Sequence, residues 1–195
     1  MARKTGSHSE ITGPRVRDAA LKLIAQHGFA AVSMRRIAEE VGVQAGALYN
    51  YTRDKQALLF DLMRNHMEEL LAARQEAAVS GDPVARLDAF TRFHIHWHLP
   101  RGDQVFISYM ELRNLTPENF AEIERLRKVY EDELEHILQD GVDAGLFHLD
   151  DTKVTTLAII AMLTGMSTWY RAEGRLSLDR IEGLYVGMVR RLVGI

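Results

Sequence analysis

Cysteine is absent from this chain of 195 residues, which excludes disulfides, thiolate metal sites and a cysteine nucleophile. Long apolar runs are also missing, because the most apolar stretch, 154–169, contains five Thr or Ser residues and is too short to span a bilayer. The first 13 residues are polar and lack the apolar core of a signal peptide. We therefore expect a cytoplasmic protein that does not enter a membrane.

Catalytic signatures are lacking as well. The chain has no Gly-x-Ser-x-Gly elbow, P-loop, dinucleotide-binding fingerprint or His-Glu-x-x-His motif, and its paired carboxylates lie on charge-rich helical faces. These absences argue against the alternative of an enzyme that acts on a hydrophobic or acyl substrate. We expect neither catalysis nor a cofactor.

Helical periodicity dominates what is present. No segment shows a sustained alternation of β-branched residues, and the 47% of hydrophobic residues is enough for a sizeable core. Apolar spacing, glycines and prolines predict an all-α fold. The expected helices run from Pro14 to Gly28 and over 33–41, 44–51, 54–79, 83–98, 103–114, 117–144, 151–172 and 177–193.

Charge is distributed unevenly, although the net charge is only −3. Residues 1–60 contain nine Lys or Arg against five Asp or Glu, whereas residues 61–195 contain fifteen against twenty-two. A basic N-terminal part on an acidic body suits a single polyanion-binding end. Chance scatter is the alternative explanation for a difference of this size.

Two short helices and a tight turn are predicted between Ser33 and Tyr51. Ser33 is a good N-cap, and Gly42 can supply the positive φ that the turn needs without a Cβ clash. This is the pattern of a helix-turn-helix. Its small core is closed by Ile37, Val41, Val43 and Leu48.

Five motifs follow one another within residues 14–62. They are the run from Ala19 to Phe29, Ile37-Ala38, Gly42-Val43, Gly46-x-Leu48-Tyr49-x-Tyr51 and Lys55-x-x-Leu58-Leu59. In this combination they resemble the TetR family of repressors. The resemblance implies an all-helical homodimer with a helix-turn-helix DNA-binding domain over 14–60 and a ligand-binding and dimerisation domain over 61–195. The polar, basic residues 1–13 are expected to form a flexible arm.

The resemblance also implies roles for individual residues of the DNA-binding domain. Residues 44–51 look like the recognition helix in the major groove of operator DNA, and Lys55 resembles the family's phosphate-binding lysine. The implied DNA contacts are Ser33, Arg35, Gln44, Ala45, Gly46, Ala47, Tyr49, Asn50 and Lys55. Departures from the family at Ala45, Ala47 and Thr52 leave the operator sequence open. They also leave open a binding module that has lost its DNA function.

Residues 61–195 contain aromatic and methionine residues that could surround one apolar pocket, although ordinary core packing explains most of them. The candidate ligand-binding residues are Phe93, Trp97, Phe106, Tyr109, Met110, Arg113, Met162 and Trp169. Segment 105–127 resembles TetR regulators of fatty-acid, branched-chain or sterol breakdown, which sense acyl-CoA thioesters. The resemblance implies a small hydrophobic effector of that class. Arg113, Arg125 or Arg127 would then meet CoA phosphates, or pair with neighbouring glutamates.

Small residues in the last two predicted helices permit close helix approach, which suits a four-helix interface between two subunits. The candidate interface residues are Ala158, Met162, Gly165, Leu184, Gly187 and Met188. Packing within one chain is the alternative. His94 and His98 have a spacing that can bind zinc, but no nearby carboxylate ligand can be named. We therefore favour histidines that face a pocket or solvent, and we expect no metal.

Overall fold

The computed structural model describes residues 7–195, with side chains from residue 12 onward, and every regular element in that range is a helix. The all-α prediction is therefore confirmed. The elements are α1 (Ser7–His27), α2 (Met34–Val41), η1 (Ala45–Asn50), α3 (Lys55–Glu76), α4 (Pro83–His98), η2 (Leu99–Arg101), α5 (Gly102–Met110), η3 (Leu112–Asn114), α6 (Pro117–Asp143), α7 (Thr152–Thr164), α8 (Met166–Trp169) and α9 (Leu178–Leu192), where η marks a 3-10 helix.

The chain folds into two compact units. Unit 1 runs as far as His66 and also contains Asp103–Glu124, whereas unit 2 contains Met67–Gly102 and Arg125–Ile195. The sequence analysis placed the whole of 61–195 in one domain, and the structure divides that range differently. Segment 103–124 belongs with the N-terminal helices, because the Glu111 carboxylate accepts a hydrogen bond from the Phe29 N–H and the Asn114 carbonyl accepts one from the Gln56 side chain.

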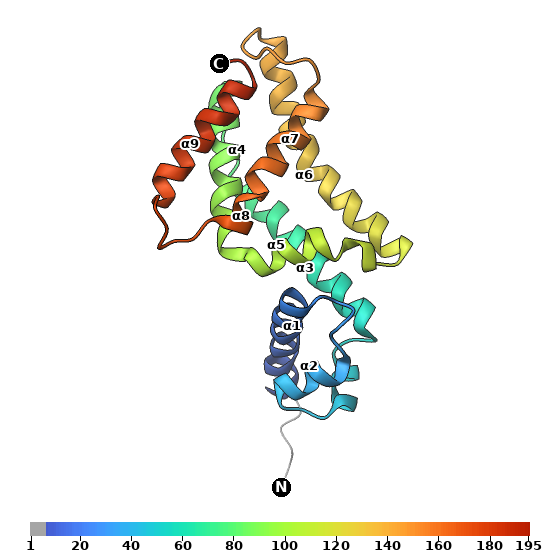
Figure 1. The fold of residues 1–195 in the computed structure, drawn as a ribbon. Coiled ribbons are helices and arrows are strands. Elements are labelled where there is room, and N and C mark those ends of the chain that lie inside the picture. Colours follow the sequence, from blue (N-terminus) through green and yellow to red (C-terminus); the bar gives the residue numbers. More distant parts are fainter. Residues whose placement is uncertain (1–6) are drawn as a thin grey trace. The chain divides into compact units, whose positions relative to one another are not determined.

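Unit 1 is built around α1, α2 and η1, which appear in blue in Figure 1. Ile24 of α1, Ile37 of α2 and Leu48 of η1 are fully buried and form its centre. Ser33 caps α2 by accepting a hydrogen bond from the Arg36 N–H, as expected. Gly42 ends α2 with φ +77°, so the predicted turn glycine has the conformation that favours glycine.

The helix α1 begins at Ser7, earlier than the expected start at Pro14. Residues 7–13 of the predicted flexible arm are therefore helical, and residues 1–6 of that arm lie outside the described residues. Thr12 and Gly13 are buried, and a Cβ on Gly13 would lie 3.7 Å from Tyr51 Cδ1. This packing favours a longer helix, even though Pro14 inside it removes one backbone hydrogen-bond donor.

Unit 2 packs α4 against α7 and α9. Its centre contains fully buried apolar residues from three helices, among them Leu87, Phe90, Ile95, Ile137 and Ile159. The helix expected over 151–172 is broken at Gly165 into α7 and α8 and ends at Trp169. A glycine disfavours the interior of a helix, because it loses more conformational freedom there than any other residue.

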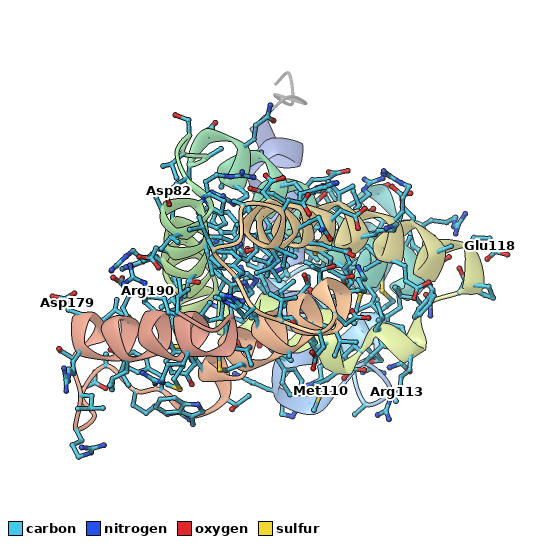
Figure 2. The ribbon with its side chains drawn as sticks, turned by 90° about the horizontal axis from the view of Figure 1, so that it is seen from above. Asp82, Met110, Arg113, Glu118, Asp179 and Arg190 are labelled. Atoms are coloured by element: carbon cyan, nitrogen blue, oxygen red, sulfur yellow. The ribbon has the colours of Figure 1, made fainter. Side chains whose placement is uncertain are left out.

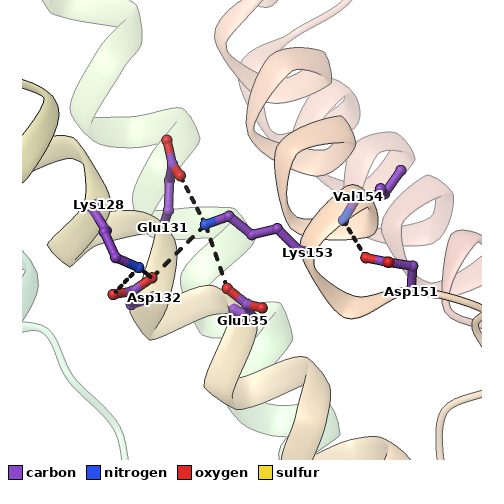
Figure 3. Close-up of polar contacts among 7 residues, drawn as sticks. All are labelled: Lys128, Glu131, Asp132, Glu135, Asp151, Lys153 and Val154. Atoms are coloured by element: carbon purple, nitrogen blue, oxygen red, sulfur yellow. Dashed lines mark hydrogen bonds and ion pairs between the residues drawn. The ribbon is translucent and has the colours of Figure 1, made fainter.

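A group of charged residues joins α6 to the first turn of α7 (Figure 3). Lys153 Nζ lies 3.0 Å from Glu131, 3.4 Å from Glu135 and 3.8 Å from Asp132. Burial alone would lower the pKa of Lys153, but the hydrogen bonds and charges of Glu131 and Glu135 outweigh it and raise that pKa. The helix α7 also carries two of the candidate interface residues, Ala158 and Met162.

Candidate DNA-binding and effector sites

The predicted recognition helix is present as the short 3-10 helix η1, Ala45–Asn50. Leu48 is completely buried and anchors the helix to unit 1, whereas Tyr49 is 58% exposed. Gln44, Ala45, Gly46 and Asn50 are exposed too, and Ala47 is half-buried. The element therefore presents small residues, a phenol and two amides to solvent, which are groups that can approach base edges and phosphates closely.

Ser33 and Arg35, which are predicted to contact the DNA backbone, lie at the start of α2. The Ser33 hydroxyl is engaged in capping α2. Arg35 pairs with Glu39 at 3.0 Å, and both side chains are largely exposed. Since an exposed ion pair contributes little stability, Arg35 can leave Glu39 for a phosphate at small cost. Both residues remain predicted DNA contacts.

Lys55 has a structural role that the sequence analysis did not anticipate. Its ammonium donates hydrogen bonds to the backbone carbonyls of Phe29 and Val32, both at 2.8 Å, and lies 4.1 Å from the centre of the Phe29 ring. Burial lowers the pKa of Lys55. The ammonium thus holds the turn between α1 and α2, and its contact with a DNA phosphate remains a prediction.

The departures from the family pattern in this domain have different structural consequences. Thr52 is buried, and its hydroxyl donates to the Asp54 carbonyl at 3.0 Å. The Asp54 carboxylate in turn accepts from the Ala57 N–H at 2.7 Å, which caps α3 as expected and lowers the pKa of Asp54. Thr52 therefore supports the fold, whereas Ala45 is exposed on η1.

The predicted effector residues divide between the two units. Phe106, Tyr109, Met110 and Arg113 belong to unit 1, and Phe93, Trp97, Met162 and Trp169 belong to unit 2. Figure 2 labels Met110, the last residue of α5, and Arg113, which lies three residues further along the chain in η3. Phe106, Tyr109 and Met110 are 41%, 45% and 58% exposed, so α5 presents a row of large apolar side chains.

Aromatic contacts organise the effector residues of unit 2. Phe93 stacks on Trp97 with ring centres 6.1 Å apart, and the guanidinium of Arg101 lies 3.5 Å from the Trp97 ring centre. A hollow of about 200 Å³ lies beside Trp169 and is also lined by Arg171 and Arg175, which sequence reasoning did not name. Unit 2 thus offers both apolar rings and cations to a ligand.

His94 and His98 of α4 are engaged in contacts within unit 2. His94 and His98 are buried with their rings stacked 3.8 Å apart, and His94 Nδ1 and Nε2 lie 3.1 Å from the hydroxyls of Tyr130 and Thr164. Burial holds the pKa of His94 well below its ordinary value and lowers that of His98 to about 4. Among the described residues, no group of three or more His, Asp or Glu is arranged to hold a metal ion.

The candidate interface residues lie on α7, α9 and the junction of α7 with α8. Ala158 and Leu184 are exposed, and the other four are half-buried. Val154 and Leu157, which sequence reasoning did not include, are also exposed on these helices, and so is Leu192. Across residues 7–195, none of the helices has the length and apolar composition to cross a membrane.

Comparison with known proteins identifies two matching family descriptions. "Bacterial regulatory proteins, tetR family" matches residues 16–62, and "Tetracyclin repressor-like, C-terminal domain" matches residues 80–193. The chain is also similar to the HTH-type transcriptional repressor KstR2 of Rhodococcus jostii (strain RHA1). The two are 25% identical over 189 residues, which cover 95% of this chain and 90% of KstR2.

Solved structures resemble the chain over nearly its whole length. A tetR-family regulatory protein from Rhodococcus RHA1 has a TM-score of 0.87 and 28% identity, covering 94% of this chain and 97% of that protein. AibR, solved in complex with isovaleryl coenzyme A and operator DNA, has a TM-score of 0.83 and 28% identity, covering 91% of this chain and 97% of AibR.

Proposed function

We infer the function from one premise: the chain belongs to the tetR family of bacterial regulatory proteins. The chain is therefore a transcription regulator and not an enzyme, as both the motifs near the N-terminus and the missing catalytic signatures indicated. We propose that it represses transcription by binding operator DNA as a homodimer. A small hydrophobic effector, an acyl-CoA thioester, releases it from the DNA.

The exposed face of η1 is the observation that carries the DNA-binding proposal. A six-residue helix buries little surface alone, and here η1 packs on α2 with Leu48 fully buried while Tyr49 and Asn50 stay exposed. The exposure of η1 supports the proposal, because a duplex has to reach the residues that read it. The proposal includes Ser33, Arg35 and Lys55 as contacts that fix the unit on the phosphate backbone.

The homodimer is supported by the apolar outer faces of α7 and α9. Leu157 is 45% exposed and Leu184 is 37% exposed, and Gly187 and Met188 continue the same stretch of α9. Two such helices from each subunit would bury these side chains around a two-fold axis. A symmetric dimer also supplies two recognition elements for two half-sites about one DNA turn apart.

The effector class is supported by chemistry and by a relative. AibR has been solved with isovaleryl coenzyme A and operator DNA. In unit 2 of this chain, the stacked rings of Phe93 and Trp97 and the arginines that line the hollow beside Trp169 suit a ligand with an apolar chain and an anionic end. We place the protein in the bacterial cytoplasm, because its proposed target is genomic DNA.

The proposal is tested by fluorescence anisotropy with a labelled fragment from upstream of the chain's own gene. We expect saturable binding that weakens with salt, and release by isovaleryl-CoA or octanoyl-CoA but not by free coenzyme A. Saturable binding that none of these thioesters affects would overturn the effector class alone. Absence of saturable binding to any fragment of that region would overturn the repressor itself.

A further inference from the structure

We propose that Glu111 is a positioning residue, whose buried carboxylate fixes the turn between α1 and α2 to the end of α5. A change at α5 is thereby transmitted to the DNA-reading helix. The inference rests on the proposed function, because it names the residue through which that function is regulated. All the groups involved lie within unit 1.

The Glu111 carboxylate is held by two N–H donors. Glu111 follows the last residue of α5 and is only 6% exposed. Its Oε1 accepts a hydrogen bond from the backbone N–H of Phe29 at 3.1 Å, across 82 residues of sequence. Its Oε2 accepts from Asn114 Nδ2 at 2.5 Å. A buried carboxylate keeps such partners because an unpaired charge in this position is costly.

The turn is held from a second direction by the start of α3. Lys55 donates to the Phe29 and Val32 carbonyls, so the N–H and the carbonyl of Phe29 are both engaged. Gln56 Nε2 donates to the Asn114 carbonyl and ties α3 to η3. The negative charge of Glu111 raises the pKa of Lys55 against the larger lowering by burial, so the two charges belong to one cluster.

The carboxylate lies close against the backbone of this turn. Gly28 has φ +80°, and a Cβ added there would lie 3.4 Å from Glu111 Oε1. The turn leads directly to Ser33, the N-cap of α2, and α2 packs on η1. Because closely packed groups shift together, a displacement of Glu111 moves the turn and, through α2, the recognition element.

The residues just before Glu111 provide the input. Tyr109 and Met110 are 45% and 58% exposed, and they precede the buried carboxylate directly in sequence. One short segment thus exposes the side chains of Tyr109 and Met110 to a ligand and places the buried Glu111 carboxylate against the turn between α1 and α2. This is a physical connection of the kind that coupling between two sites requires.

The absence of cysteine allows a test that needs no knowledge of the effector. A Met110→Cys protein is alkylated with N-ethylmaleimide, which adds bulk at one exposed position of α5. Operator affinity is measured by fluorescence anisotropy before and after alkylation. The measurement is made with Glu111 unchanged and again in a protein that also carries Glu111→Leu. Val129→Cys, at a 49% exposed position of α6, is the matched control for alkylation.

We expect alkylation at position 110 to change operator affinity by about fivefold or more when Glu111 is present, a typical size for coupling between sites. With Glu111→Leu we expect less than about a twofold change, and with Val129→Cys no change in either background. An equal effect of alkylation with and without Glu111 would overturn the inference. If the unmodified protein binds no operator, the proposed function fails, and the exchange measurement below still tests Glu111.

Amide hydrogen exchange separates positioning from general stabilisation. Glu111→Gln keeps an oxygen that can accept from the Phe29 N–H, whereas Glu111→Leu does not. With Glu111→Leu we expect the protection factor of the Phe29 amide to fall by about tenfold or more, which corresponds to the loss of one buried hydrogen bond. With Glu111→Gln we expect most of that protection to remain. Amides in α4 should be unchanged. Unchanged protection of Phe29, or equal loss in α4, would overturn the role assigned to Glu111.

Discussion

The buried histidine pair, His94 and His98, predicts that the folding stability of unit 2 decreases in acid. His98 is 5% exposed, and His98 Nδ1 must carry a proton because its partner, 2.9 Å away, is the His94 carbonyl oxygen. Burial lowers the pKa of His98 from an ordinary value of 6.5 to about 4. The unfolded chain therefore binds a proton more readily than the folded chain below pH 6.5. Folding stability is lost as the pH falls from about 6.5 to about 4.

The size of the effect follows from the two pKa values. At pH 5, His98 is almost fully protonated in the unfolded chain, where its pKa is ordinary, and mostly neutral in the folded chain. This difference lowers the free energy of unfolding by about 2 kcal/mol relative to neutral pH. The complete loss below pH 4 is about 3 kcal/mol. The pKa of His94 is lowered in the same direction, so His94 adds to the loss.

The assay is urea unfolding followed by circular dichroism at pH 7.5 and pH 5.0, at one protein concentration. His98→Asn keeps an amide donor near the Nδ1 position but does not titrate. We expect the variant to lose about 2 kcal/mol less than the wild type between the two pH values. His148→Asn, at an exposed position, should behave like the wild type. Equal pH dependence of His98→Asn and wild type would refute the reasoning.

Three further substitutions test the other parts of the account. Lys55→Met should destabilise the protein by about 2 kcal/mol in urea unfolding, since two charged hydrogen bonds are lost. If Lys55 also contacts a phosphate, the slope of log operator affinity against log salt concentration should decrease by about one in this variant. Leu48→Ala should cost about 3 kcal/mol by the same assay, because it empties a fully buried site; a cost under about 1 kcal/mol would contradict the anchoring of η1. Leu184→Arg should shift sedimentation towards the monomer, whereas Leu146→Arg, at a similarly exposed position, should not.

Local signals predicted most of the fold. Ser33 and Asp54 cap helices because short polar side chains bond the free N–H groups of a first turn, and Gly42 ends a helix because it tolerates positive φ. These effects act within a few residues and are visible in sequence. The same is true of η1, whose buried Leu48 and exposed Tyr49 follow from helical spacing.

Long-range contacts could not be predicted in this way. Glu111 gives no sign of its role in the sequence, because its partner Phe29 lies 82 residues away and contributes only a backbone N–H. The same contact explains why the division of the chain into units was not anticipated. Lys55 was assigned from its family role, and only the structure places its ammonium on two carbonyls of the α1–α2 turn.

The central claim is that η1 enters the duplex, and site-directed DNA cleavage measures this directly. An Ala45→Cys protein carries an iron chelate that cuts nearby DNA, and a protein tagged through Val129→Cys serves as the control. The account predicts two groups of cuts in the operator, separated by about one helical turn or a multiple of it, only for the tag in η1. Cleavage no stronger or more localised than that of the control would contradict it.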